Sequence, residues 1–181
     1  MAPTIIALSK GKLVLLLVGA LLFVVGAWWM YRLDPAEILR YGRYHNPLLV
    51  HGIGIVGMAF FGAVALFVVR KLFDRTPGLI VDAEGIVDNA SGIAVGRIVW
   101  ADILGFEERR VYNQRLLSVQ LKNPEVYVTK SPPLRRLLLR GNLALGYSPV
   151  VLSSNALSID FDTLCAVLRT AHAQARRDAQ A

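Results

Sequence analysis

Residues 13–31, LVLLLVGALLFVVGAWWMY, and residues 47–69, PLLVHGIGIVGMAFFGAVALFVV, decide the fold of this chain. The first stretch has no charged residue, and the second has His51 as its only titratable side chain. At about 1.5 Å per residue, a helix over the first stretch reaches about 28 Å, close to the roughly 30 Å hydrocarbon core of a bilayer. Because lipid cannot hydrogen-bond a backbone, both stretches are predicted to be transmembrane helices.

The end of the first stretch argues against a cleaved signal peptide. Lys10 and Lys12 precede the stretch, as basic residues precede a signal sequence, but it is too long and lacks small residues suited to cleavage. It ends in Trp28, Trp29 and Tyr31, which are typical of a membrane interface. We therefore expect an uncleaved anchor.

The positions of Lys and Arg predict the orientation of the two helices. Three basic residues lie in the predicted external loop 32–46, and five flank the outer ends of the helices: Lys10, Lys12, Arg70, Lys71 and Arg75. Because cytoplasmic segments carry the excess of basic residues, both termini are predicted to be cytoplasmic. The lone Cys165 fits a reducing compartment.

Small residues recur in both predicted helices and allow close helix packing in lipid. Gly19 and Gly26 share one face of the first helix, and the second helix contains Gly62 and Ala63 among its small residues. A tight hairpin between the two helices is the favoured explanation. The alternative is an interface with another copy of the chain or with another membrane protein.

The composition excludes several classes of function. A single cysteine excludes a disulfide framework within one chain, and three histidines leave few ligands for zinc, so no metal or cofactor is expected. The net charge is +7, but the first seventy residues carry six basic and two acidic residues, more than half of this excess. Membrane insertion accounts for those charges, so no nucleic-acid partner is expected.

Residues 1–76 therefore form a predicted membrane anchor, and residues 77–181 form a second, cytoplasmic domain. Short β-strand signals separated by turn residues fill this domain. A hairpin turn is predicted at Ala83-Glu84-Gly85, with a positive φ at Gly85. The predicted strands cover residues 79–82, 86–88, 93–100, 103–112, 116–121, 126–128, 150–152 and 157–159.

The chain ends in a predicted helix that begins after the N-cap Asp160. Its apolar side chains recur at helical spacing and form one stripe: Phe161, Leu164, Cys165, Leu168 and Ala171. Cys165 is therefore interpreted as a small buried side chain, not as a reactive thiol. About seven antiparallel strands and one capping helix make the expected fold class α+β.

This order of elements resembles a pleckstrin-homology-like (PH-like) β-barrel. Trp100-Ala101-Asp102-Ile103 is similar to a tryptophan-x-acid-isoleucine corner of bacterial PH-like domains, and further segments contribute: Pro77-Gly78-Leu79-Ile80, Gly85-Ile86-Val87-Asp88-Asn89, Leu121-Lys122-Asn123-Pro124 and Ser148-Pro149. With the two preceding helices, the chain resembles an uncharacterised family of small bacterial inner-membrane proteins. The resemblance implies a fold and a location but no activity. At the corner, Trp100 is expected to be buried and Asp102 to accept backbone hydrogen bonds.

Residues 131–145 form a basic helical segment with a candidate docking surface. On a helical wheel, five apolar residues gather on one side, and Leu139 falls among three arginines on the other: Arg135, Arg136 and Arg140. We expect these four residues to dock the domain on anionic lipid or on a membrane-associated protein. The alternative is a helix that packs on the barrel with its arginines in water.

No catalytic site is expected. Glu107 and Glu108 each have a neighbouring arginine on the same strand face, which keeps a carboxylate ionised. Ser153, Ser154 and His172 lack the strand–turn–helix elbow that exposes a nucleophilic serine. The sequence therefore favours a non-enzymatic, membrane-anchored binding module. The alternatives are an accessory subunit packing through its glycine-rich helices and, less favoured, an enzyme or transporter.

Overall fold

The computed structural model describes residues 2–41 and 46–180, which fall into two compact units. One unit is helical and comprises Lys10–Asp74. The other is globular and combines Met1–Ser9 with Arg75–Ala181. The sequence had placed residues 1–76 together in the anchor, whereas the contacts assign the N-terminal residues to the globular unit.

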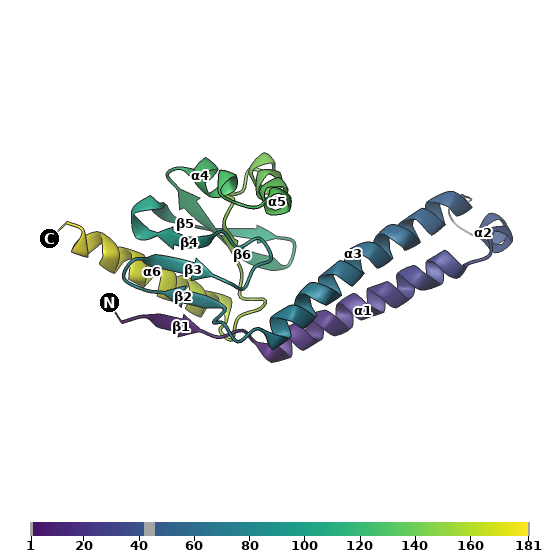
Figure 1. Ribbon diagram of the computed structural model, residues 1–181, viewed down its shortest axis with the longest axis horizontal. Helices are drawn as coiled ribbons and strands as arrows, with labels where there is room; N and C mark the ends of the chain where they lie inside the picture. The colour runs from purple at the N-terminus through teal and green to yellow at the C-terminus, as the bar shows by residue number, and fades with distance from the viewer. Residues whose placement is uncertain (1, 42–45, 181) are drawn as a thin grey trace. The chain divides into compact units, whose positions relative to one another are not determined.

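The helical unit consists of α1 (Lys10–Arg32), α2 (Pro35–Tyr41) and α3 (Pro47–Phe73). Figure 1 shows α1 and α3 packed side by side along their length. Both long helices are apolar enough to cross a membrane, and 17% of the most apolar window of each is buried. Most of their apolar side chains therefore face outward. The short helix α2 lies within the predicted loop 32–46.

Among the glycines of α1 and α3, Gly54 and Gly57 lie at the contact between the two helices. A Cβ at Gly54 would lie 2.8 Å from the Ala27 carbonyl oxygen, and one at Gly57 would lie 3.1 Å from the Ala27 Cβ. A Cβ at Gly19, Gly26 or Gly62 would meet no atom within 4 Å, and Ala63 is exposed. Seven-residue spacing identifies a shared helix face, but it does not indicate which face meets the neighbouring helix.

The globular unit contains two antiparallel sheets. The first has the order β1-β2-β3-β4: β1 (Thr4–Ile6), β2 (Leu79–Val81), β3 (Gly85–Asp88) and β4 (Gly96–Val99). A 3-10 turn, η1 (Trp100–Asp102), leads into the second sheet, with the order β5-β6-β7: β5 (Ile103–Val111), β6 (Gln114–Leu121) and β7 (Val151–Leu152). The α+β prediction is confirmed. No strand pairing within residues 2–41 and 46–180 joins the sheets, so they do not form the expected closed barrel.

Strand β1 was missed by the sequence analysis. Its residues Thr4 and Ile6 pair with Val81 and Leu79 of β2, and Ile6 is buried. The following Ser9 donates its amide hydrogen to the Ala156 carbonyl at 2.8 Å. A strand of three residues is too short to show an alternating pattern.

Two of the predicted strands were wrong. Residues 126–128 lie in the helix α4 (Pro124–Thr129), because Pro124 occupies the first helical turn, where it is favoured. Residues 157–159 form no strand, and Leu157 makes only a single bridge with Leu8. The segment 93–100 shortens to β4.

The helix α6 (Phe161–Asp178) covers the core of the globular unit. The Asp160 carboxylate caps it by accepting the Thr163 amide hydrogen at 2.8 Å, as predicted. Leu164 and Leu168 are fully buried against side chains from both sheets. Cys165 lies in the same cluster, and burial raises the pKa of its thiol, which makes it less reactive.

Gly85 is required because of a close approach to a neighbouring strand. A Cβ at this position would lie 2.0 Å from the Ile98 carbonyl oxygen of β4. Its φ is not positive, contrary to the prediction; the described glycines with a positive φ are Gly96 and Gly146. The backbones of β3 and β4 therefore leave no room for a side chain here.

Candidate functional site

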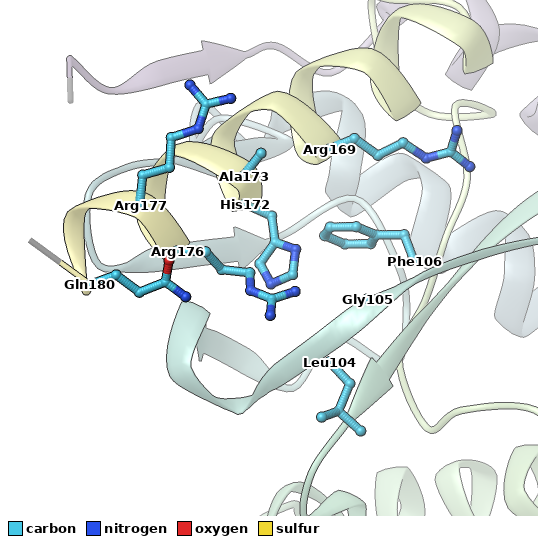
Figure 2. A pocket seen from close by; sticks show the side chains of 9 residues that line it. All are labelled: Leu104, Gly105, Phe106, Arg169, His172, Ala173, Arg176, Arg177 and Gln180. Carbon is cyan, nitrogen blue, oxygen red and sulfur yellow. The ribbon is translucent and has the colours of Figure 1, made fainter.

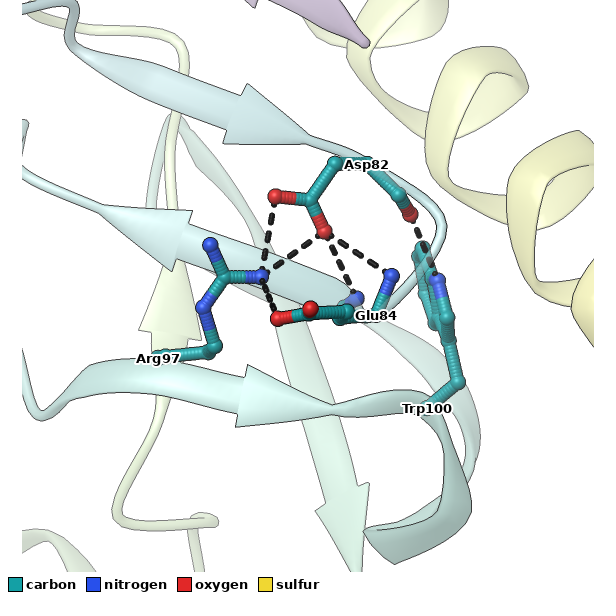
Figure 3. A network of polar contacts seen from close by, with 5 residues as sticks. Asp82, Glu84, Arg97 and Trp100 are labelled. Carbon is teal, nitrogen blue, oxygen red and sulfur yellow. Dashed lines mark hydrogen bonds and ion pairs between the residues drawn. The ribbon is translucent and has the colours of Figure 1, made fainter. Parts of the chain in front are cut away.

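The corner between the two sheets is held by a polar network around Asp82 (Figure 3). The Asp82 carboxylate accepts the amide hydrogens of Glu84 and Gly85, both at 3.0 Å, and binds the Arg97 guanidinium at 2.8 Å. Burial alone would raise the pKa of Asp82, but these hydrogen bonds hold it below its ordinary value. The buried Trp100 donates its indole hydrogen to the Asp82 carbonyl at 2.9 Å. This network closes the β2–β3 turn and fixes the corner.

Asp102 has a different partner from the one expected. Its carboxylate accepts a hydrogen bond from the Tyr127 hydroxyl at 2.6 Å, and its main-chain carbonyl accepts the Lys122 amide hydrogen at 2.9 Å. Tyr127 is buried in α4. Burial, the hydrogen bond to Asp102 and the charge of Asp102 raise the pKa of Tyr127 to about 12. Asp102 therefore joins α4 to the corner.

Tyr127 predicts a loss of stability at alkaline pH. Its pKa is raised from 10.0 to about 12 in the folded chain, so the folded state holds the phenolic proton more tightly than the unfolded state does. The stabilisation of the folded state that comes from this raised pKa is complete below about pH 10, and it is lost as the pH rises towards 12. In urea unfolding at several pH values, Tyr127→Phe should flatten this decline. The control Tyr112→Phe, at a side chain that is 98% exposed, should retain it. Equal declines in both variants would contradict the assignment.

The candidate docking residues lie on α5 (Pro133–Ala144), and the structure reverses the expected orientation of this helix. Leu139 is fully buried, so it cannot insert into lipid. Arg135 donates to the Ala94 carbonyl, and Arg136 donates to the Thr129 carbonyl at 2.6 Å. These two arginines therefore hold α5 on the globular unit, and only Arg140 of the three is exposed.

The opposite side of α5 is an exposed apolar surface. Leu134 is 73% exposed, Leu137 67% and Leu138 50%, and Leu145 follows the helix with 73% exposure. These four residues, called here the leucine face, fall on one side of the helical wheel. The helical wheel groups these leucines on one side, but it places the expected docking residues on the other side. Because apolar side chains in water are unfavourable, an exposed row of leucines indicates an interaction surface.

The acidic residues considered for catalysis are paired. The Glu107 carboxylate lies 3.1 Å from the Arg109 guanidinium, and that of Glu108 lies 2.8 Å from the Arg115 guanidinium. The hydrogen bond from Arg115 lowers the pKa of Glu108. The four side chains are 32–46% exposed, so both pairs reach solvent, which matches the interpretation of solvated strand charges.

His172, also considered for catalysis, is buried in α6, and its Nε2 lies 3.1 Å from the Ile103 carbonyl oxygen. Because a carbonyl only accepts, Nε2 carries the hydrogen. Within residues 2–41 and 46–180, no three His, Cys, Asp or Glu side chains are grouped to hold a metal ion.

Comparisons of this chain with family models, with curated proteins and with solved structures found no match.

Proposed function

We propose that this chain is a non-enzymatic binding module anchored in the bacterial inner membrane, with a PH-like globular unit on the cytoplasmic side. In this proposal the globular unit contacts the bilayer through the leucine face of α5. The distribution of Lys and Arg around α1 and α3 supports the cytoplasmic side. The four-stranded and three-stranded antiparallel sheets followed by α6 support the PH-like assignment.

Two short connections support a permanent position at the membrane. Residues 7–9 join β1 to α1, and residues 74–78 join α3 to β2. At about 3.5 Å per extended residue, the longer connection spans at most about 18 Å. If α1 and α3 cross a bilayer, the globular unit is attached to it at two points and cannot diffuse away.

The pairing of β1 with β2 adds a constraint on topology. These strands precede α1 and follow α3, so they must lie on the same side of any membrane. That condition is met when both helices cross and is violated when only one crosses. Cleavage after α1 would also remove β1 from its sheet, which further argues for an uncleaved anchor.

The single observation that carries the docking proposal is the leucine face. Moving one exposed leucine side chain out of water is worth on the order of 1.5–3 kcal/mol. The exposed Arg140 lies on the same helix and adds about 1 kcal/mol near an anionic surface. The combination of apolar and basic side chains fits the interfacial region of an anionic bilayer better than it fits water.

Spin labelling of the full chain in nanodiscs tests this proposal. A nitroxide at Leu138→Cys, in a Cys165→Ser background, should be reached by lipid-soluble oxygen and protected from a water-soluble nickel reagent. The control label at Tyr112→Cys, a position that is 98% exposed, should remain accessible to nickel. Arg140→Glu should weaken the protection at position 138 in anionic lipid but not in zwitterionic lipid. Equal nickel accessibility at both positions would refute docking through the leucine face.

An accessory subunit of a membrane complex is the second candidate. It is favoured by the open space beside Gly19, Gly26 and Gly62, which the contact between α1 and α3 does not use. Small residues with free space around them allow another transmembrane helix to approach closely. Gly26→Leu should then abolish copurification of a membrane partner, while labelled Leu138→Cys stays in water.

A further inference from the structure

A cavity in the globular unit lies between α6 and the edge strand β5 (Figure 2). Its volume is about 510 Å³, within the range of small-molecule sites. Figure 2 shows Arg176 and Gln180 reaching from α6 towards β5, whereas the side chains of Arg169 and Arg177 extend away from the space between them. None of these residues belongs to the surface of α5, so this site is separate from the leucine face.

The charges that line the cavity are all positive. The lining includes Arg169, Arg176 and Arg177 and contains no Asp or Glu. The arginines that pair with carboxylates in the described part of the globular unit lie elsewhere: Arg97, Arg109 and Arg115. Cations at the C-terminal end of α6 are favoured by the helix dipole, which accounts for Arg176 and Arg177 but not for Arg169. With Arg176 directed into the cavity and two further arginines beside it, the local positive potential favours binding of an anion.

The backbone of β5 is irregular where it lines this cavity. Its pairing with β6 shifts register between Ile103 and Gly105, which leaves Leu104 as an extra residue in the strand. Such bulges re-aim side chains beside binding sites. A Cβ at Gly105 would meet no atom within 4 Å, so this glycine leaves space in the lining.

Two rings form the inner wall of the cavity. Phe106 and His172 make an edge-to-face contact with ring centroids 5.6 Å apart. His172 is fixed by the bond from Nε2 to the Ile103 carbonyl. The wall is therefore rigid and partly apolar, while the rim is basic.

We propose that this cavity binds a phosphate monoester, with the phosphate held by Arg176 and Gln180 and the remainder of the ligand against Phe106. The guanidinium group matches two phosphate oxygens at once, which favours phosphate over a spherical anion such as chloride. The ester has two sources, a soluble phosphorylated compound or the headgroup of a lipid such as phosphatidate. Both present the same phosphate chemistry to the arginines.

Titration of the full chain in zwitterionic nanodiscs tests this site, with the amide resonance of Phe106 in the lining as the readout. The probes are inorganic phosphate, a soluble short-chain phosphatidate and a glutamate-rich peptide. Saturable shifts with phosphate and phosphatidate support the site. Saturation with both probes at similar affinity would show that a phosphate group is sufficient for binding. Saturation with phosphatidate alone would identify the lipid headgroup as the ligand.

Variants separate this site from general electrostatic attraction. Arg176→Gln should weaken binding about tenfold or more, and Gly105→Leu should block the cavity and abolish binding. The control Arg110→Gln removes an exposed arginine of β5 that lies outside the cavity. This variant should bind the probes like the parent chain. An equal loss in Arg110→Gln and Arg176→Gln would overturn the proposal. Saturation with the glutamate-rich peptide alone, or no saturation with any probe, would also overturn it.

Discussion

Gly85→Ala is expected to destabilise the globular unit by about 4 kcal/mol or more, a large part of the 5–15 kcal/mol that stabilises a typical domain. The added Cβ would lie 2.0 Å from the Ile98 carbonyl oxygen and 2.9 Å from the Val99 Cα. Both atoms belong to the backbone of β4, which pairs with β3 at this point. Relief of the clash therefore requires the two strands to separate.

Urea unfolding of the full chain measures this effect through the fluorescence of Trp100, with Trp28 and Trp29 replaced by phenylalanine. Gly105→Ala is the matched control, since it adds the same methyl group to a strand where no atom lies within 4 Å. It should change the free energy of unfolding by less than about 0.5 kcal/mol. Similar stability of the two variants would show that β3 and β4 do not approach as closely as described.

Leu139→Ala is expected to cost about 2–5 kcal/mol of unfolding free energy, because Leu139 is fully buried and its loss leaves a cavity. Leu137→Ala removes the same atoms from a side chain that is 67% exposed. Its effect in water should lie within about 0.5 kcal/mol. The difference between two leucines in the same helix depends only on which side of α5 faces the core.

The same urea measurement decides the orientation of α5. A large effect at Leu139 with a small effect at Leu137 agrees with the described packing. The reverse order would restore the orientation expected from the helical wheel, in which the basic side faces outward. It would also remove the leucine face as a docking surface.

The long helices and most strands could be predicted from the sequence, because their signals are local. A charge-free run such as residues 13–31 has few alternatives to a buried or membrane-spanning helix. The alternation of residues in β6 and the cap at Asp160 are equally local. Strand β1 could not be predicted, because residues 4–6 become a strand only by pairing with β2, more than seventy residues away.

The prediction of the orientation of α5 was wrong for a different reason. An amphipathic helix in water is expected to pack its wider apolar side inward. Here the side that carries Leu139 and the arginines packs inward instead. Arg135 and Arg136, which flank Leu139, donate hydrogen bonds to main-chain carbonyls of neighbouring segments. Those carbonyls become available only in the folded chain, so the wheel could not indicate them.

The predicted site residues show the same division between local and tertiary signals. The corner at Trp100 was recognisable as a motif, but the bond between Asp102 and Tyr127 joins segments far apart in the sequence. The cavity beside α6 depends on the bulge at Leu104, which is a property of strand pairing. The sequence therefore shows Arg169, Arg176 and Arg177, but it does not indicate the cavity that they line.

Disulfide crosslinking of β1 to β2 in membranes tests the central claim. The claim is that α1 and α3 anchor a globular unit formed by the segments that precede α1 and follow α3. Ile5 and Ile80 face each other in the β1–β2 register, so Ile5→Cys/Ile80→Cys in a Cys165→Ser background should crosslink under mild oxidation. The crosslinked chain should stay in the membrane pellet after washing at alkaline pH. Failure of these cysteines to crosslink, or release of the crosslinked chain into the supernatant, would contradict the account.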